Sequence, residues 1–378
     1  MGIDYERRWA RASELMQAAG IDAVFVMKPA NLAYLSGDGR PCALALLTAA
    51  GEYIVSVPEC DRPGVEAAAR ATEVRTFRSE EEMFHGYRDL LADRGLDRAT
   101  IGLEKNFFDA SLHEVFAAHI LPNAEVVSAT PVLSRLRMCK DADEIELMRG
   151  AARVAAVGME AAVDAARAGV SEILIAGEAE YAMRRAGAEG WGIPTYVASG
   201  ARTAMAHGPA SPKVVESGDV VQIHLSPIAG GYTVDLCRTV FVGEPPADAA
   251  RLLDVYLEAV DAGIAAAAPG APLLGIDAAL AAVLHDAGLD DAFLRPTFHG
   301  VGIEHEEAPI PGGHAVVHGE AEIESVEAGM ALAIGNCGIY REAFGVRNED
   351  TVWVSPDGPV VLTRVVLAGE TTDSATAD

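Results

Sequence analysis

The sequence predicts an N-terminal α/β domain over residues 1–136, followed by an α+β domain over residues 137–378. Amphipathic helices alternate with short apolar strands in the first third of the chain. The chain changes character over 133–146, and two long helices and many glycine-punctuated strands follow. The length of 378 residues is ample for two domains with separate cores.

The elements of the first third can be assigned in order. An amphipathic helix over 5–19 is ended by Gly20, and a buried strand over 22–27 follows it. Strands over 43–48 and 53–58 form a hairpin around a short turn. The remaining predicted elements alternate along the chain: helices over 61–71, 79–94 and 110–119, and strands over 73–77, 100–104 and 124–128.

The second domain is predicted to begin with two helices. Asp141 or Asp143 can cap a long helix that runs to Ala168 and is closed by Gly169. A second helix covers 172–186 and leads toward a pair of strands around a glycine turn. The later predicted elements are helices over 247–267 and 274–287 and a set of strands between 297 and 354.

Composition excludes several classes of function. The formal net charge of −27 argues against binding nucleic acid or anionic membranes through bulk electrostatics. No run of about 18 apolar residues is present, and the charged N-terminus lacks a signal-peptide core. The five cysteines are scattered and form no CxxC pair, so we expect no disulfide framework and a cytoplasmic location. We therefore expect a small-molecule partner, no nucleic acid and no membrane.

The strand pair around the glycine turn carries the most informative polar pattern. One face of its first strand is apolar, and His224 lies among polar residues on the other face. If a two-residue turn centres on Ala229-Gly230, His224 lies directly opposite Asp235. An imidazole facing a carboxylate is a candidate ligand pair or acid–base pair. The alternative is an ordinary cross-strand pair, but the polar neighbours on the same face favour a polar cavity.

Four ordered motifs resemble a known family. They are Ala206–Pro209, the strand pair with His224 and Asp235, Phe298–Pro309 and Gly345–Thr351. Their order and spacing resemble the pita-bread superfamily of Xaa-Pro peptidases, methionine aminopeptidases and creatinase. The segment from Arg137 to Ile145 resembles the entry to that catalytic domain, and the first domain resembles the one in the creatinase and prolidase branch. The resemblance implies a curved antiparallel sheet flanked by helices, and a homodimer.

The resemblance also implies a set of metal ligands, from which this chain departs. Metallopeptidases of the family hold two ions with Asp, Asp, His, Glu and Glu. Asp235, His299 and Glu349 keep three of these positions, whereas His224 replaces the first Asp and Gly335 the first Glu. Two close divalent cations need several anionic oxygens, so we expect no complete dinuclear centre. The open alternatives are one Zn, Mn or Fe ion held by the residues His224, Asp235, His299 and Glu349, or no metal, as in creatinase.

His207 is the carried-over general acid/base, because its motif resembles the one that holds the catalytic histidine of creatinase. The resemblance adds three residues to the predicted catalytic group: His299, Glu349 and Asp235. The predicted substrate-binding residues are Arg40, His305, Glu306 and Asn336. His305 stands one place before the position of a second family histidine, which is Glu306 here. In relatives, loops like the one that carries Arg40 reach the pocket of a neighbouring subunit.

The predicted function is a creatinase-like hydrolase that cleaves a C–N bond in a small amino-acid-like molecule. One alternative is a metal-dependent Xaa-Pro dipeptidase or aminopeptidase. Another is a catalytically inactive relative that acts as a binding protein, because fold alone does not fix function.

Overall fold

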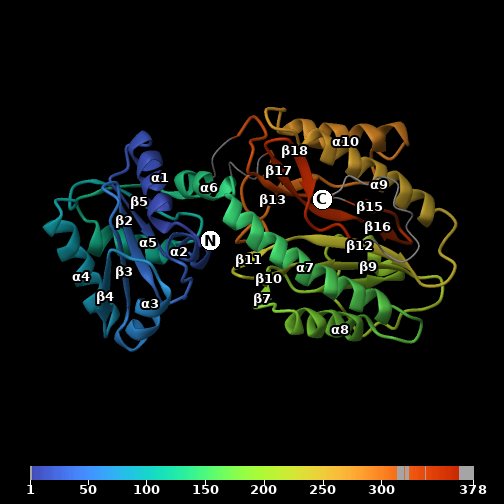
Figure 1. The fold of residues 1–378 in the computed structure, drawn as a ribbon, viewed down its shortest axis with the longest axis horizontal. Coiled ribbons are helices and arrows are strands. Elements are labelled where there is room, and N and C mark those ends of the chain that lie inside the picture. Colours follow the sequence, from blue (N-terminus) through green and yellow to red (C-terminus); the bar gives the residue numbers. More distant parts are fainter. Residues whose placement is uncertain (1, 313–318, 320–322, 337, 366–378) are drawn as a thin grey trace. The chain divides into compact units, whose positions relative to one another are not determined.

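The computed structural model describes residues 2–312, 319, 323–336 and 338–365. These residues form two compact units, one mainly over 2–138 and the other over 139–312 and 323–365 (Figure 1). His314 and His318, which the sequence suggests to be loop residues, lie outside the described residues, as does the acidic C-terminal tail. Within the described ranges, no helix has the length and apolar character needed to cross a bilayer.

The first unit is built on a mixed sheet. Its strands are β1 (Ala23–Val26), β2 (Leu44–Thr48), β3 (Tyr53–Pro58), β4 (Glu73–Phe77), β5 (Thr100–Leu103) and β6 (Glu125–Ser128). They are ordered β4-β3-β2-β1-β5-β6. The β1–β2 and β2–β3 pairs are antiparallel and the others parallel, so the predicted hairpin over 43–58 is confirmed.

Helices pack on this sheet through aromatic contacts. They are α1 (Tyr5–Ala18), α2 (Pro29–Ser36), α3 (Arg62–Ala68), α4 (Glu80–Asp93), α5 (Ala110–Val115) and α6 (Thr130–Met138). Phe25 on β1 makes edge contacts with Tyr87 and Phe116 at centroid distances of 5.1 and 5.3 Å. Helix α2 was not predicted. The helix is bounded by Pro29 at its start and by Gly37, with φ of 86°, at its C-cap. Because it is short and mostly apolar, its sequence shows no amphipathic pattern.

The helices of the second unit confirm the sequence pattern. They are α7 (Ala142–Ala165), α8 (Glu172–Arg185), α9 (Ala249–Ala266) and α10 (Leu274–Asp286). Asp141 is the N-cap of α7, and it forms a reciprocal capping box with Glu144. Asp143, the alternative cap, lies in the first turn instead.

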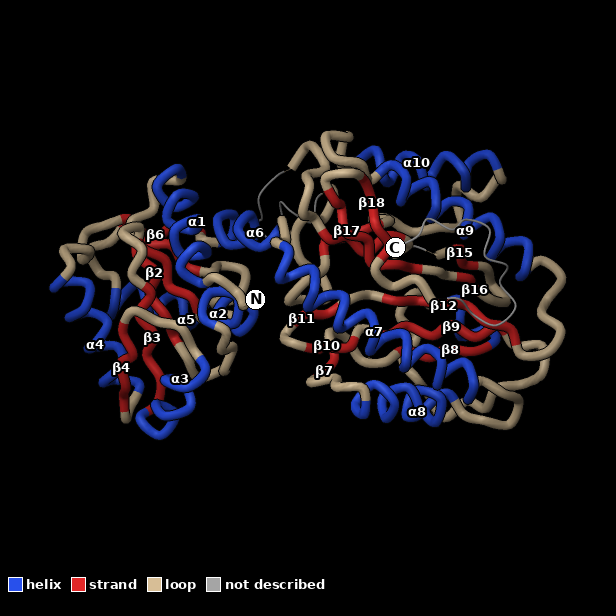
Figure 2. The backbone as a smooth tube through the Cα atoms, in the orientation of Figure 1, coloured by secondary structure: helices blue, strands red, loops and turns tan. Residues whose placement is uncertain are grey.

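The strands of the second unit make a curved sheet between helices (Figure 2). They are β7 (Gly190–Trp191), β8 (Tyr196–Ser199), β9 (Val220–Leu225), β10 (Pro227–Ala229), β11 (Tyr232–Thr233), β12 (Leu236–Phe241), β13 (Phe298–Gly300), β14 (Ala331–Ile334), β15 (Ile339–Tyr340), β16 (Gly345–Val346), β17 (Glu349–Ser355) and β18 (Gly358–Val361). The main sheet has the order β13-β14-β17-β12-β9-β8, with β18 against β17. Every pair in it is antiparallel.

The two faces of β9 belong to different surroundings, as its alternating pattern predicts. Val221, Ile223 and Leu225 lie in the core formed with α7 and α8. Val220, on the opposite face, lies in the core formed with α9 and α10. His224 shares the face of Val220, so it points away from the α7–α8 core.

The predicted register of the strand pair is wrong by two residues. His224 lies directly opposite Cys237, not Asp235. The turn is Gly230-Gly231, because Ala229 pairs with Tyr232 and both glycines have positive φ, at 60° and 75°. A tight turn with two positive φ angles favours glycine, which has no Cβ and adopts these angles without strain. Since a shift of two keeps every side chain on its face, His224 and Asp235 still meet diagonally.

Candidate metal centre and active site

Five ionisable side chains from separate segments converge on the main sheet of the second unit. They are His224 on β9, Asp235 before β12, His299 on β13, His305 in the turn after β13, and Glu349 at the start of β17. Four of these side chains are at most 5% exposed, and His305 is 15% exposed. Buried ionisable groups that face one another are typical of functional sites.

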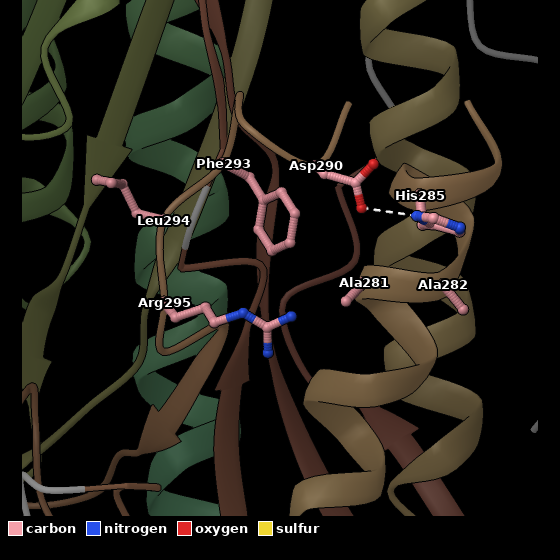
Figure 3. Close-up of a pocket in the computed structure, with 7 residues that line it drawn as sticks. All are labelled: Ala281, Ala282, His285, Asp290, Phe293, Leu294 and Arg295. Atoms are coloured by element: carbon pink, nitrogen blue, oxygen red, sulfur yellow. Dashed lines mark hydrogen bonds and ion pairs between the residues drawn. The ribbon is translucent and has the colours of Figure 1, made fainter. Parts of the chain in front are cut away.

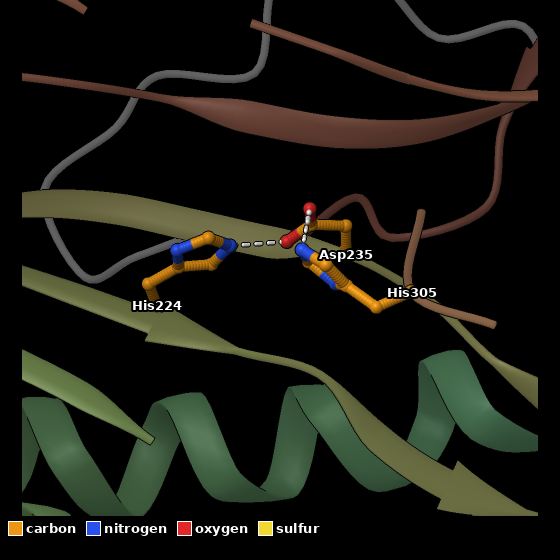
Figure 4. A group of neighbouring side chains, drawn as sticks. All are labelled: His224, Asp235 and His305. Atoms are coloured by element: carbon orange, nitrogen blue, oxygen red, sulfur yellow. Dashed lines mark hydrogen bonds and ion pairs between the residues drawn. The ribbon is translucent and has the colours of Figure 1, made fainter. Parts of the chain in front are cut away.

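Asp235 lies at the centre of the group. His224 Nε2 hydrogen-bonds to its Oδ1, and Figure 4 shows His224 and His305 on either side of the carboxylate. Oδ2 accepts no hydrogen bond although it is buried, and the Nε2 atoms of His299 and His305 each lie 3.5 Å from it. The main-chain N–H of Asp235 donates to Thr351 Oγ1 at 2.8 Å, which holds the carboxylate in position.

The two oxygens of Glu349 differ in the same way as those of Asp235: one has a hydrogen bond and the other has none. Oε2 accepts a hydrogen bond from Arg347 Nη2 at 2.5 Å. Oε1 is buried without a hydrogen bond and lies 3.8 Å from His299 Nε2. Arg347 also donates to Oδ1 of Asn336, a predicted substrate-binding residue, at 2.8 Å.

The tautomer of His299 is assigned by its neighbour. Its Nδ1 lies 3.0 Å from the carbonyl oxygen of Gly300, which can only accept a hydrogen bond. Nδ1 therefore carries a proton, and in the neutral ring Nε2 presents a lone pair to Asp235 and Glu349. Metal-binding histidines commonly have this arrangement.

The pKa values of the cluster are strongly perturbed. Burial raises the pKa of Glu349 despite the Arg347 guanidinium. Burial acts to raise the pKa of Asp235 too, but His224 and His305 hold it well below its usual range. Burial lowers the pKa of His305 to about 3, whereas for His299 the neighbouring carboxylates of Asp235 and Glu349 outweigh burial and raise the pKa to about 9. The two carboxylates therefore titrate as part of one coupled group.

Two triads could hold a metal ion, and they share Asp235. One is His224, Asp235 and His305, and the other is Asp235, His299 and Glu349. The second triad contains both carboxylate oxygens that lack a hydrogen bond. Tetrahedral ligands bound at about 2.0–2.2 Å lie about 3.3–3.6 Å from one another, close to the separations around His299. The donor set of the second triad therefore fits a divalent ion.

One oxygen of each carboxylate already has a partner within the protein. His224 covers Oδ1 of Asp235 and Arg347 covers Oε2 of Glu349. The missing family glutamate cannot be restored, because Gly335 has φ of 110° and a Cβ there would lie 2.1 Å from the carbonyl oxygen of Asn348. The backbone of this chain thus excludes a side chain at that position.

His207 lies at the edge of the cluster. It is exposed, and its ring makes an edge contact with Tyr196 at 6.3 Å. Tyr196 in turn contacts the His224 ring at 5.9 Å. Both residues line a small cavity with Arg347, and the two chain neighbours of His207 also line it. Burial, with smaller contributions from Arg347 and His224, lowers the pKa of His207, which favours the neutral ring.

The other predicted substrate-binding residues have separate environments. Arg40 lies in the first unit, where Asp38 Oδ2 holds its guanidinium at 2.6 Å. Glu306 is exposed, whereas the next residue, Glu307, is buried and paired with Lys140 at 2.8 Å.

Sequence reasoning assigned no role to Arg347 or to the Lys140–Glu307 pair. The signal for Arg347 was its spacing, since a charged residue two places before Glu349 on an extended segment shares its face.

Comparisons with known proteins identify the family of this chain. Residues 146–356 match the model of metallopeptidase family M24, and residues 8–139 match the creatinase/prolidase N-terminal domain. The chain is 29% identical to the Xaa-Pro dipeptidase of Pyrococcus furiosus, an alignment that covers 95% of this chain and 98% of that protein.

Two solved structures are similar over nearly the whole chain. The prolidase of Pyrococcus horikoshii OT3 has a TM-score of 0.84 at 27% identity, over 96% of this chain and 99% of that one. An Xaa-Pro dipeptidase from Bacillus anthracis has a TM-score of 0.87 at 26% identity, over 96% and 98% of the two chains. The predicted architecture is confirmed, and the chain belongs to metallopeptidase family M24, in the creatinase and prolidase branch, as a hydrolase of C–N bonds.

Proposed function

We propose that the protein is a metal-dependent Xaa-Pro dipeptidase. The observation that carries this proposal is the similarity to Xaa-Pro dipeptidases over nearly the full length of both chains. This function is the alternative that the sequence offered beside a creatinase-like hydrolase, and the relatives support it better. A dipeptide is also a small amino-acid-like molecule with one C–N bond to cleave.

One divalent ion bound by Asp235, His299 and Glu349 would act as a Lewis acid and lower the pKa of a bound water. The protein's own residues prepare the site for it. Arg347 fixes the carboxylate of Glu349 with one oxygen turned inward, and Thr351 fixes the main chain of Asp235. The Gly300 carbonyl fixes the His299 ring, so the three ligand atoms are positioned before any ligand binds.

His207 is the proposed proton carrier. An exposed imidazole at the cavity edge can receive a proton from water and deliver it to the departing amide nitrogen. Its lowered pKa favours the neutral ring, which is the form that accepts the proton first. Tyr196 orients the ring by edge contact.

A creatinase-like hydrolase is the second candidate, and one observation favours it. Two ligand carboxylates of the family are replaced, by His224 and by Gly335 at a position where no side chain fits. If that reading holds, the protein acts without metal, and His207 and Glu349 do the chemistry directly.

Substrate and metal dependence separate the two candidates. The purified protein is assayed with proline dipeptides, matched dipeptides that lack proline, and creatine, before and after chelation and metal return. Cleavage of proline dipeptides that is lost on chelation and restored by metal is expected. Chelator-resistant hydrolysis of creatine or a related small molecule would favour the second candidate, and a protein inactive on every substrate would support the binding-protein alternative.

We also propose a homodimer in which Arg40 serves the partner's pocket. The support is the resemblance of the first domain to those of relatives, together with the bidentate hold of Asp38 on the guanidinium, which keeps Arg40 in a fixed direction. Sedimentation at micromolar concentration tests the dimer. A monomer with wild-type activity would contradict both parts.

A further inference from the structure

A chain of hydrogen bonds fixes the tautomer of His305. Thr233 Oγ1 donates its single proton to the carbonyl oxygen of Pro227 at 2.9 Å, so toward Ser226 Oγ, also at 2.9 Å, it must accept. Ser226 therefore gives its proton to Thr233 and can only accept from His305 Nδ1, which lies 3.1 Å away. The proton of the neutral His305 ring is on Nδ1, and Nε2 carries a lone pair.

Lone pairs then face one another around Asp235. The Nε2 atoms of His299 and His305 each lie 3.5 Å from Asp235 Oδ2, and both rings carry their proton on Nδ1. Oδ2 has no hydrogen bond, and neither does the nearby Oε1 of Glu349. When both rings are neutral, four acceptor atoms face one another in a buried site without a donor between them, an arrangement that a bound cation stabilises.

The role of His224 is different. Its Nε2 is the atom that hydrogen-bonds to Asp235 Oδ1, so this nitrogen carries a proton and offers no lone pair to a metal. A histidine that donates to a ligating carboxylate orients that ligand.

We propose that His305, and not His224, is the fourth ligand of a single metal ion, beside Asp235, His299 and Glu349. This inference rests on the metal of the proposed function and deepens it. His224 is a positioning residue that holds Asp235. Together with Arg347 on Glu349, it occupies the carboxylate oxygens that a second ion would need.

The turn that carries His305 is built to hold it. Gly300 and Glu307 pair across the turn, where the Glu307 N–H donates to the Gly300 carbonyl at 2.9 Å. The Glu307 carboxylate is buried against Lys140 at 2.8 Å. His305 thus projects from a closed turn whose two ends are fixed, and its 15% exposure makes it the most accessible of the four proposed ligands.

The donor set predicts which ions bind. Two imidazole nitrogens and two carboxylate oxygens suit Zn²⁺, Co²⁺ or Fe²⁺ better than Mg²⁺ or Ca²⁺, which prefer oxygen ligands. A carboxylate in place of His305 would reduce this discrimination.

The test is metal binding by the full-length, metal-free protein, without substrate. Zn²⁺ and Co²⁺ are titrated by calorimetry and by competition with a chelator, and bound metal is counted by elemental analysis. The variants are His305→Ala, His224→Ala and a remote control, His285→Ala. His285 is an exposed histidine of α10 paired with Asp290 at 2.7 Å in a surface pocket (Figure 3).

The expected wild-type result is one ion per chain. Loss of an orienting partner weakens metal affinity by about 10–100-fold, so His224→Ala should fall in that range. His305→Ala should lose more than about 100-fold and shift the absorption bands of bound Co²⁺, while His285→Ala should bind as wild type. His305→Gln, which keeps the size of the side chain, should also bind weakly. It replaces His305→Ala if circular dichroism shows that variant to be misfolded.

Other outcomes would overturn the assignment. They are wild-type affinity in the folded His305 variants, a greater loss in His224→Ala than in His305→Ala, or two ions per wild-type chain. Failure of the proposed function has a different signature, namely a wild-type protein that binds one ion but cleaves no proline dipeptide. In that case the ligand assignment stands and the dipeptidase proposal falls.

Discussion

Two buried carboxylate sites in this molecule have opposite surroundings. In the first unit, Glu104 is fully buried, and its oxygens accept hydrogen bonds from the main-chain N–H groups of Met27 and Lys28 and from the Asn31 amide, at 2.5–2.8 Å. In the second unit, Asp235 and Glu349 are equally buried, but each leaves one oxygen without a partner.

The difference separates a structural carboxylate from one prepared for a ligand. Neutral donors surround Glu104, and they tie β1, α2 and β5 together. Glu172 in the second unit is also satisfied, by Ser199, Ser211 and Arg202, so the contrast does not simply follow the domain boundary. Burial alone therefore marks no function, whereas two unpartnered carboxylate oxygens that face the same histidine are typical of a ligand site.

Asp235→Asn should lower activity far more than it lowers stability, and this is the largest effect that we expect. We expect kcat/KM to fall at least about 10³-fold, because a metal contributes several kcal/mol to charge stabilisation in the transition state. The new amide N–H can donate to the Nε2 lone pair of His299 or His305, which offsets part of the lost attraction between Asp235 and His224, so the metal-free protein should stay folded. Urea denaturation and steady-state kinetics measure both. Loss of folding in this variant would show that the charge of Asp235 is structural.

Glu104→Ala should give the reverse pattern. Two main-chain N–H groups and the Asn31 amide lose their acceptor, which should lower the free energy of unfolding by about 3 kcal/mol. Activity per folded molecule should not change. Glu52→Ala is the matched control, since it removes a half-exposed partner of Arg94 and should cost about 1 kcal/mol or less. The two units can unfold separately, so tertiary and secondary structure are followed together. Equal losses in both variants would contradict the comparison.

His207→Ala tests the role of the histidine at the edge of the Asp235 and Glu349 cluster. We expect kcat to fall about 10²-fold, the usual scale for a general acid/base, with a smaller change in KM. Stability should hardly change because the ring is exposed. A raised KM with wild-type kcat would make His207 a substrate-binding residue only.

Much of the fold followed from local patterns. Helix ends set by Asp141 and Gly20, and the β2–β3 hairpin, depend on residues close in sequence, so they were predictable within one to three residues. Helix α2 and the register of the strand pair were not. The first lacks an amphipathic stripe, and the second depends on which two of three adjacent residues form the turn.

The sequence predicted which residues form the site better than it predicted how their atoms contact one another. Family motifs pointed to Asp235, His299 and Glu349, and the structure brings them together. Which nitrogen of His224 or His305 carries a proton depends on partners far away in sequence, such as Thr233 for His305, and no spacing rule reveals it.

The smallest expected effect concerns how the ionisation of Glu104, whose carboxylate is fully hydrogen-bonded, makes stability depend on pH. Burial raises the pKa of Glu104 above its ordinary value of 4.5, against the hydrogen bonds that lower it. The folded protein therefore binds this proton more tightly than the unfolded chain does. The resulting stabilisation is fully present below pH 4.5 and is lost as pH rises through the folded-state pKa.

Glu104→Gln removes the titration while it keeps an oxygen for the two main-chain N–H groups. The stability advantage of wild type over this variant should thus shrink as pH rises from 4.5 toward neutrality, in urea denaturation at a series of pH values. An advantage that grows with pH would mean that the hydrogen bonds to the carboxylate outweigh the effect of burial.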